Sequence, residues 1–207
     1  MKKLLVILDS GHGGMVDGVY ITAPSKQFKH ADGTWAYEGV LNRKVKAKLM
    51  EKLKLNKIAH FDVTPFEADI PPTFRVANAN MAQAKYPNHQ CLYLSIHSNA
   101  GGGLGTGFEL FTSPGKTKSD EFATIFGEQI QLAFPNIAFR KDIADGDLDK
   151  EAKFYVLVHT AMPAVLVELL FFDNPTDWAI LQTEGYYNQI ADALVAAILR
   201  SQTEITT

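Results

Sequence analysis

The sequence contains one cysteine and no long hydrophobic run. A lone cysteine cannot form an internal disulfide, so folding of this chain does not require an oxidising compartment. Cys91 lies within the apolar run 91–94, where we expect it to act as a small core side chain. No apolar run approaches the roughly 20 residues of a membrane-spanning helix, so the sequence predicts no membrane partner.

A secretion signal is also missing from the chain as it stands. Lys2 and Lys3 are followed by only five apolar residues before Asp9, too few for the core of a signal peptide. We therefore expect synthesis in the cytoplasm without an export signal of its own.

Positive charge is not in excess. There are 20 Lys and Arg residues against 23 Asp and Glu residues, which gives a formal net charge of -3. A nucleic-acid-binding surface normally needs a basic patch. The lysines between residues 44 and 57 instead alternate with Val45, Leu49 and Leu53, as on the solvated face of an amphipathic helix. The sequence thus predicts no nucleic-acid partner.

The composition is that of one folded domain. A chain of 207 residues with 46% hydrophobic residues can bury a sizeable core and is unlike a disordered protein. We place the domain at residues 1–200 and expect residues 201–207 to form a polar, frayed tail. We expect a monomer.

Short apolar runs alternate with amphipathic stretches along the chain. Runs at residues 4–8, 92–96 and 164–167 have the length and β-branched content of strands buried on both faces. Segments 108–112 and 154–158 predict further strands, and Asn174 followed by Pro175 predicts a helix start. Apolar stripes at helical spacing occur at residues 41–53, 74–84, 122–130 and 190–199. This alternation predicts an α/β domain whose sheet is covered by helices.

One segment does not fit this pattern. Residues 15–37 are too long for an ordinary connection between a strand and a helix. The segment either shapes a substrate site or forms a surface hairpin without a role.

Three predicted strands run directly into ionisable residues, namely His12, His97 and Glu168. The carboxyl ends of strands in an open α/β sheet line one crevice, so these side chains can meet there. Two imidazoles and a carboxylate, with one position left open, suit a hydrolytic zinc site. Glu168 could be the third ligand, but Glu38, at the start of the lysine-rich helix, is the better candidate. A carboxylate there also suits the helix dipole without any further role.

The glycines around His12 favour this interpretation over a phosphate loop. Residues 11–14 have neither the lysine of a Walker loop nor the third spaced glycine of a dinucleotide fingerprint. Glycine on both sides of His12 allows a sharp turn and leaves room beside the imidazole.

Five motifs occur in the order found in a known family. They are DSGHGG at residues 9–14, EGVLN at 38–42, RVANAN at 75–80, SIHSNA at 95–100 and PAVLVELLFFDN at 163–174. Together they cover the chain from about residue 4 to residue 182. In these residues the sequence resembles the zinc-dependent N-acetylmuramoyl-L-alanine amidases of the type 3 family.

The resemblance implies one zinc ion held by His12, Glu38 and His97, with Glu168 as the catalytic carboxylate. It implies a mixed, mostly parallel sheet flanked by helices on both faces. It also implies peptidoglycan as substrate, cut between the lactyl group of N-acetylmuramic acid and L-alanine of the stem peptide. The enzyme would then act on the cell wall, either as a released phage-type lysin or as a domain of an exported protein.

Further site residues are expected with less support from the motifs. Asn42 and Asn99 are expected to orient ligands or substrate, since metal-bound imidazoles usually donate their other N–H to an oxygen. His30 and Trp35, in the long segment, are expected to touch glycan or peptide.

The chain departs from the family pattern in three places. Ser10 replaces a proline, the segment between His12 and Glu38 is longer than in simpler members, and Val158-His159 stands where the family often has an arginine. Two alternative functions stay open. One is a catalytically silent peptidoglycan-binding or regulatory protein of the same fold, and the other is a different zinc amidohydrolase or peptidase.

Overall fold

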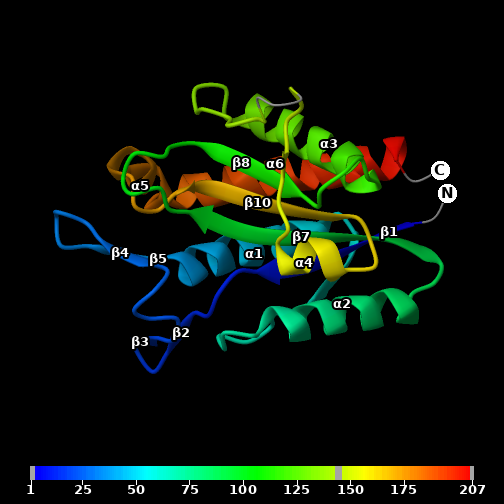
Figure 1. Cartoon of the computed structure of the whole chain (residues 1–207), viewed down its shortest axis with the longest axis horizontal. Coiled ribbons are helices and arrows are strands. Elements are labelled where there is room, and N and C mark those ends of the chain that lie inside the picture. The colour runs from blue at the N-terminus through cyan, green and yellow to red at the C-terminus, as the bar shows by residue number, and fades with distance from the viewer. Residues whose placement is uncertain (1–2, 143–145, 206–207) are drawn as a thin grey trace.

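A mixed six-stranded sheet forms the centre of the molecule (Figure 1). The computed structural model describes residues 3–142 and 146–205. The strands lie in the order β6 (Ala59–Asp62), β1 (Lys3–Ser10), β7 (His89–Asn99), β10 (Ala164–Phe171), β8 (Phe108–Thr112) and β9 (Lys150–Glu151). Strands β6, β1, β7 and β10 are parallel, and β8 runs antiparallel to β10. The mostly parallel sheet implied by the sequence is confirmed.

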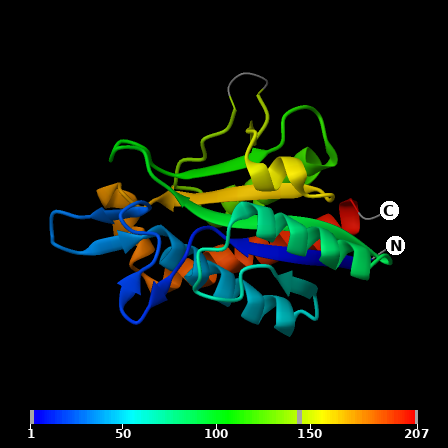
Figure 2. The ribbon, with the colours of Figure 1, turned by 60° about the horizontal axis from the view of Figure 1, so that its bottom comes forward.

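Helices cover both faces of this sheet. On one face lie α1 (Glu38–Leu55), α3 (Lys118–Ala133) and α6 (Glu184–Glu204), and on the other α2 (Pro72–Lys85) and α4 (Tyr155–His159). Figure 2 shows α2, in teal, lying in front of the sheet. None of the helices within the described ranges is long and apolar enough to cross a membrane.

Strand β1 shows how the sequence builds two cores. Successive side chains of a strand point to opposite faces, so Leu4, Val6 and Leu8 pack with α1, α3 and α6 in one cluster. Leu5 and Ile7 pack in the second cluster with α2 and α4. Burial on both faces explains why the run is continuously apolar.

Most of the predicted elements are confirmed. The four strands predicted from residues 4, 92, 108 and 164 onward form β1, β7, β8 and β10, and the four apolar stripes lie on α1, α2, α3 and α6. Asn174 caps the short helix α5 (Pro175–Leu181), where its side chain accepts hydrogen bonds from the N–H groups of Thr176 and Asp177. Cys91 is buried in the second core.

The predicted strand at residues 154–158 is wrong, because all of these residues except Phe154 belong to helix α4, which Phe154 precedes. Val156 and Leu157 are adjacent and both buried, whereas a strand with one buried face would bury only one of two adjacent side chains. The N–H groups of Leu157 and Val158 both bond to the carbonyl of Phe154, which closes a local helical turn. The aromatic and β-branched content that favoured a strand is a weak preference that tertiary packing overrides.

The expected boundary after residue 200 is also corrected. Helix α6 continues to Glu204, and Ser201 is buried with its hydroxyl donating to the carbonyl of Ala197. Ile205 packs into the first core cluster. This apolar anchor keeps the end of the helix attached to the domain. Residues 206–207 of the expected tail lie outside the described part of the chain.

One lysine of α1 is not solvated as expected. Lys46 is buried, and its ammonium lies 2.9 Å from both carboxylate oxygens of Asp62. It also donates to the carbonyl oxygen of Thr64 at 2.5 Å. The buried ion pair therefore ties α1 to the segment that follows β6.

The long segment folds as two small hairpins. Strands β2 (Met15–Val16) and β3 (Val19–Tyr20) form the first, and β4 (Gln27–Lys29) and β5 (Trp35–Tyr37) form the second. Both project from the same end of the molecule (Figure 1). Because β5 runs directly into α1, the second hairpin sets where Glu38 begins the helix.

Candidate active site

Three side chains from separate elements meet at the carboxyl ends of β1 and β7. His12 lies just beyond β1, His97 lies near the end of β7, and Glu38 is the first residue of α1. Glu38 Oε1 is 2.9 Å from His97 Nδ1 and 3.2 Å from His12 Nε2. One donor atom from each residue lies within 4.8 Å of the others. The structure thus brings together all three predicted ligands.

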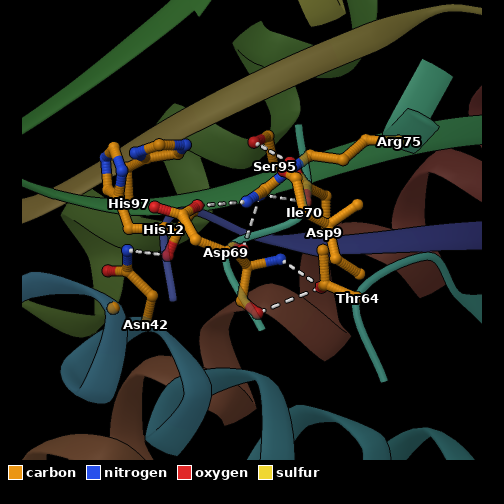
Figure 3. A network of polar contacts seen from close by, with 12 residues as sticks. Asp9, His12, Asn42, Thr64, Asp69, Ile70, Arg75, Ser95 and His97 are labelled. Carbon is orange, nitrogen blue, oxygen red and sulfur yellow. Dashed lines mark hydrogen bonds and ion pairs between the residues drawn. The ribbon is translucent and has the colours of Figure 1, made fainter. Parts of the chain in front are cut away.

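Two glycines make this approach possible. A Cβ at Gly11 would lie 2.2 Å from Cε1 of His97, and a Cβ at Gly39 would lie 1.8 Å from the carbonyl oxygen of Gly13. His12 has a φ of +63°, a left-handed conformation that few side chains adopt without strain. The turn brings the two imidazole rings to 5.1 Å between centroids and perpendicular to each other (Figure 3).

Residues of α1 hold the turn at residues 11–12 in place. Asn42, fully buried, donates to the carbonyl oxygen of Gly11 and accepts from the hydroxyl of Ser98. Arg43 donates to the carbonyl oxygen of His12 at 2.7 Å. Asn42 therefore positions the backbone beside the ligand. Arg43 is a support that the sequence analysis missed, because its partner is a backbone atom and carries no sequence signal.

A buried ion pair fixes the end of β1. Arg75 Nη1 donates to Asp9 Oδ1 and to the carbonyl oxygen of Ser10, both at 2.7 Å (Figure 3). Asp9 also accepts from the hydroxyl of Ser95 at 2.7 Å. Burial alone would raise the pKa of Asp9, but the charges of Arg75 and His97, together with hydrogen bonds such as that from Ser95, lower the pKa. Asp9 is therefore an ionised structural anchor beside the site.

The charges of the three candidate ligands support one another. Burial opposes ionisation of Glu38, but the contacts with His12 and His97 hold its pKa well below the usual range. Burial opposes a charge on His97 as well, yet the hydrogen bond to Glu38 and the charge of Glu168 raise its pKa. Without a metal, a proton on His97 and a negative charge on Glu38 stabilise each other.

The donor set also fits a metal ion. His12 Nε2 is buried and makes no hydrogen bond of regular geometry within the described residues. A buried nitrogen without such a partner is costly unless something else satisfies it. Two imidazole nitrogens and one carboxylate oxygen are the ligands that zinc prefers at a hydrolytic site. Magnesium or calcium would call for more oxygen atoms.

Glu168 lies next to the three candidate ligands. It is paired with His97 in the register between β10 and β7. Burial raises the pKa of Glu168 to about 8; the charge of His97 works against this, and the charge of Glu38 adds to it. Its Oε2 atom is buried without a hydrogen-bond partner within the described residues. A carboxyl group poised in this way can take up and release a proton near neutral pH.

These groups open onto one cavity of about 480 Å³. Its lining includes His12, His97 and Glu168, with Lys26 and Tyr155 on its walls. The cavity lies at the strand ends, where ligands bind in open α/β sheets. Lys26 comes from the long segment, which therefore contributes to the site.

One expected site residue lies elsewhere. His30 is buried, donates through Nε2 to the carbonyl oxygen of Phe172 at 2.9 Å, and stacks on Trp178 with centroids 4.8 Å apart. The expectation that His30 touches substrate is corrected, because packing encloses the ring. Asn99 donates to Glu109 at 2.7 Å, and its expected role in orienting ligands or substrate stays a prediction.

Trp35 is 42% exposed and stacks on Tyr37, with 6.0 Å between ring centroids. It does not belong to the cavity lining described above. A contact between this ring and glycan or peptide stays a prediction.

Comparison with known proteins identifies the family. The model of the N-acetylmuramoyl-L-alanine amidase family matches residues 6–200. The chain belongs to this family. The amidase is 30% identical over 200 residues to the endolysin of Bacillus phage SPP1 and 30% identical over 190 residues to the amidase CwlM of Bacillus licheniformis. These alignments cover 93% and 90% of this chain, and 63% and 64% of those proteins.

The fold of the amidase is also found among solved structures. The N-acetylmuramoyl-L-alanine amidase from Clostridium difficile 630 superposes with a TM-score of 0.80 and 26% identity. The superposition covers 99% of this chain and all of that one. The chain therefore carries an N-acetylmuramoyl-L-alanine amidase domain, and the predicted architecture is confirmed.

Proposed function

We propose that this amidase uses one zinc ion, held by His12, Glu38 and His97, to hydrolyse the amide bond between N-acetylmuramic acid and L-alanine in peptidoglycan. The observation that carries the proposal is the convergence of three donor atoms within 4.8 Å beside Glu168, whose Oε2 atom is buried. The family match supports the bond and the substrate. The proposed place of action is the cell wall, where an endolysin also acts.

Each ligand would be held by contacts already in place. Zinc supplies Lewis-acid chemistry, since it makes water acidic near neutral pH and polarises an amide carbonyl. His12 is held by the turn that Arg43 and Asn42 support, and His97 by strand β7. Little rearrangement is then needed on binding, which favours catalysis because the geometry is set in advance.

Glu168 would move the proton. Amide hydrolysis adds a water oxygen to the carbonyl carbon, breaks the C–N bond and requires a proton on the departing nitrogen. Glu168 takes the proton from water and delivers it to that nitrogen, which restores its own starting state. Such general acid and base assistance contributes about 10² to 10⁴ in rate.

The test is digestion of purified cell walls with and without a zinc chelator. We expect release of stem peptides that begin with L-alanine, identified by mass spectrometry, and loss of release after chelation. Elemental analysis should find about one zinc per chain. Fragments cut at another bond would instead indicate a different zinc amidohydrolase or peptidase. Binding to walls without release would indicate a catalytically silent protein.

A further inference from the structure

Lys26 places a positive charge at the mouth of the active-site cavity. The residue precedes β4 and has a left-handed backbone with φ of +59°. Its carbonyl oxygen accepts a hydrogen bond from the N–H of Glu38 at 3.0 Å, so its backbone is tied to the start of α1. Its side chain lines the cavity together with the candidate ligands.

The ammonium of Lys26 has spare hydrogen-bonding capacity. Its closest carboxylate contact is Glu38 Oε2 at 3.6 Å, beyond hydrogen-bond distance, and its side chain is 46% exposed. A lysine ammonium offers three donors. None of them has an acceptor within hydrogen-bond distance in the described part of the chain. The group is therefore available to an anion that enters the cavity.

The other permanent cation of the cavity lining is already occupied. Arg75 bonds to Asp9, to the carbonyl oxygens of Ser10 and Ile70, and contacts Asp69, and it is buried. These acceptors leave it little capacity for substrate. A negatively charged substrate group thus finds at Lys26 a cation that is ion-paired with Glu38 but whose N–H donors are still open.

The walls of the cavity differ in character. Helix α4 and the residue before it contribute Tyr155, Val156 and Phe154, whose side chains are aromatic or aliphatic. Lys26 lies on a different segment, the connection between the two hairpins. An asymmetric cavity of this kind orients a substrate that has an anionic part and an uncharged part.

We propose that Lys26 is a carboxylate-binding subsite that recognises the stem peptide through the free α-carboxylate of its second residue, D-isoglutamate. This inference rests on the proposed function. An extended chain advances about 3.3 to 3.6 Å per residue. A carboxylate on the second residue therefore lies within about 7 Å of the scissile nitrogen, within the reach of a lysine close to Glu38. An amidated second residue, D-isoglutamine, loses the charge that Lys26 recognises.

The test measures binding to a protein that does not turn the ligand over. Zinc-loaded E168Q is titrated calorimetrically with N-acetylmuramoyl-L-alanyl-D-isoglutamate and with its isoglutamine counterpart. We expect the carboxylate to bind about tenfold more tightly, as for one charge-assisted hydrogen bond. In E168Q/K26M the two ligands should bind equally, and E168Q/K26R should recover part of the preference. Zinc content is measured in every variant.

Lys29 provides the matched control. It is a lysine of the same segment whose ammonium lies 5.8 Å from the centroid of the exposed Trp35 ring, outside the cavity lining. E168Q/K29M should keep the tenfold preference. Equal binding of both ligands before Lys26 is changed, or an unchanged preference in E168Q/K26M, would overturn the subsite. An equal loss of affinity for both ligands would also overturn it, because Lys26 would then interact with a group common to both.

Failure of the proposed function is recognised separately. If the wild type releases no L-alanine peptides from cell walls, the amidase activity is refuted whatever the titrations give. If it releases them and the two ligands bind alike, the amidase stands and the Lys26 subsite is wrong.

Discussion

The site shows at the residue scale how identical side chains receive different roles. Glu38 and Glu168 both face His97, but Glu38 contacts both histidines and stays ionised. Glu168 is half-buried, its Oε2 atom is buried without a hydrogen bond, and its pKa rises to about 8. The environments push the two pKa values apart, which is how paired carboxylates divide ligand and acid–base roles.

Replacement of Glu168 by glutamine tests this division. E168Q keeps the shape of the side chain but cannot carry the proton, so we expect the rate of wall hydrolysis to fall by about 10² to 10⁴. Zinc content, measured by elemental analysis, should match the wild type. E38Q is the matched comparison and should lose zinc. An E168Q protein that hydrolyses walls at the parent rate would refute the proposed role.

Zinc affinity should depend on pH through His97. Metal binding needs a neutral imidazole, and the raised pKa of His97 keeps it protonated to higher pH than usual. We therefore expect affinity to weaken as pH falls through this raised pKa, by about tenfold per pH unit for one displaced proton. Competition with a chromophoric chelator measures it. A zinc affinity that stays constant over this pH range would contradict the displacement of a proton from His97.

The same proton has the opposite effect on the metal-free protein. A raised histidine pKa contributes stability that is fully present below the unfolded value of 6.5 and is lost as pH rises through the folded value. Metal-free protein should therefore lose this contribution at the pH where zinc binds best, and urea denaturation at several pH values can check it.

At the scale of elements, the site depends on how closely β1 approaches β7. The carbonyl oxygen of Ile96 accepts a hydrogen bond from the N–H of Gly11 at 2.9 Å, which continues the pairing of the two strands up to the ligand turn. The ring of His97 occupies the space where a Cβ on residue 11 would lie. The histidine spacing therefore depends on this glycine.

G11A tests the close approach. The added methyl overlaps the ring of His97, so we expect loss of zinc binding and a cost of about 1 to 3 kcal/mol from overpacking. G185A is the control, because a Cβ on this residue of α6 meets nothing within 4 Å. It should keep zinc and gain up to about 1 kcal/mol. Elemental analysis and urea denaturation measure both effects, and normal zinc content in G11A would contradict the steric account.

The anchor between α2 and β1 also belongs to this scale. R75A leaves Asp9 buried and ionised without its partner. We therefore expect this variant to lose about 3 to 5 kcal/mol of unfolding free energy. R200A removes an exposed arginine paired with Glu128 and Glu204 and should change stability far less. Urea denaturation compares them. Equal losses would show that the Asp9 pair is no more than a surface contact.

The sequence predicts elements well where the pattern is local. The strand at residues 4–8 is apolar throughout because both of its faces are covered, and the stripes on α1 and α6 have helical spacing. Residues 154–158 were mispredicted because their turn is decided by packing against the sheet. His30 misled for a similar reason, since its partners Phe172 and Trp178 lie more than 140 positions away. Motif order, in contrast, predicted the three candidate ligands that the structure brings together.

For the molecule as a whole, the candidate metal site joins three elements distant in sequence. The candidate ligands come from residues after β1, from β7 and from α1, so an ion that binds only to the folded state would stabilise the entire domain. Zinc at about 100 times its Kd should add about 2.7 kcal/mol. Calorimetric melting with and without zinc should show a higher Tm for the wild type and no zinc-dependent change for H12A. A shift of equal size in H12A would place the ion elsewhere.

The lengths of the strands bear on the behaviour of the domain in concentrated solution. The inner strands β1, β7 and β10 have eight, eleven and eight residues, while the outermost β6 and β9 have four and two. Short outer strands offer few open backbone groups to which a neighbouring chain could add itself, and this protects against edge-to-edge aggregation. We therefore expect size-exclusion chromatography to show single chains even at high protein concentration.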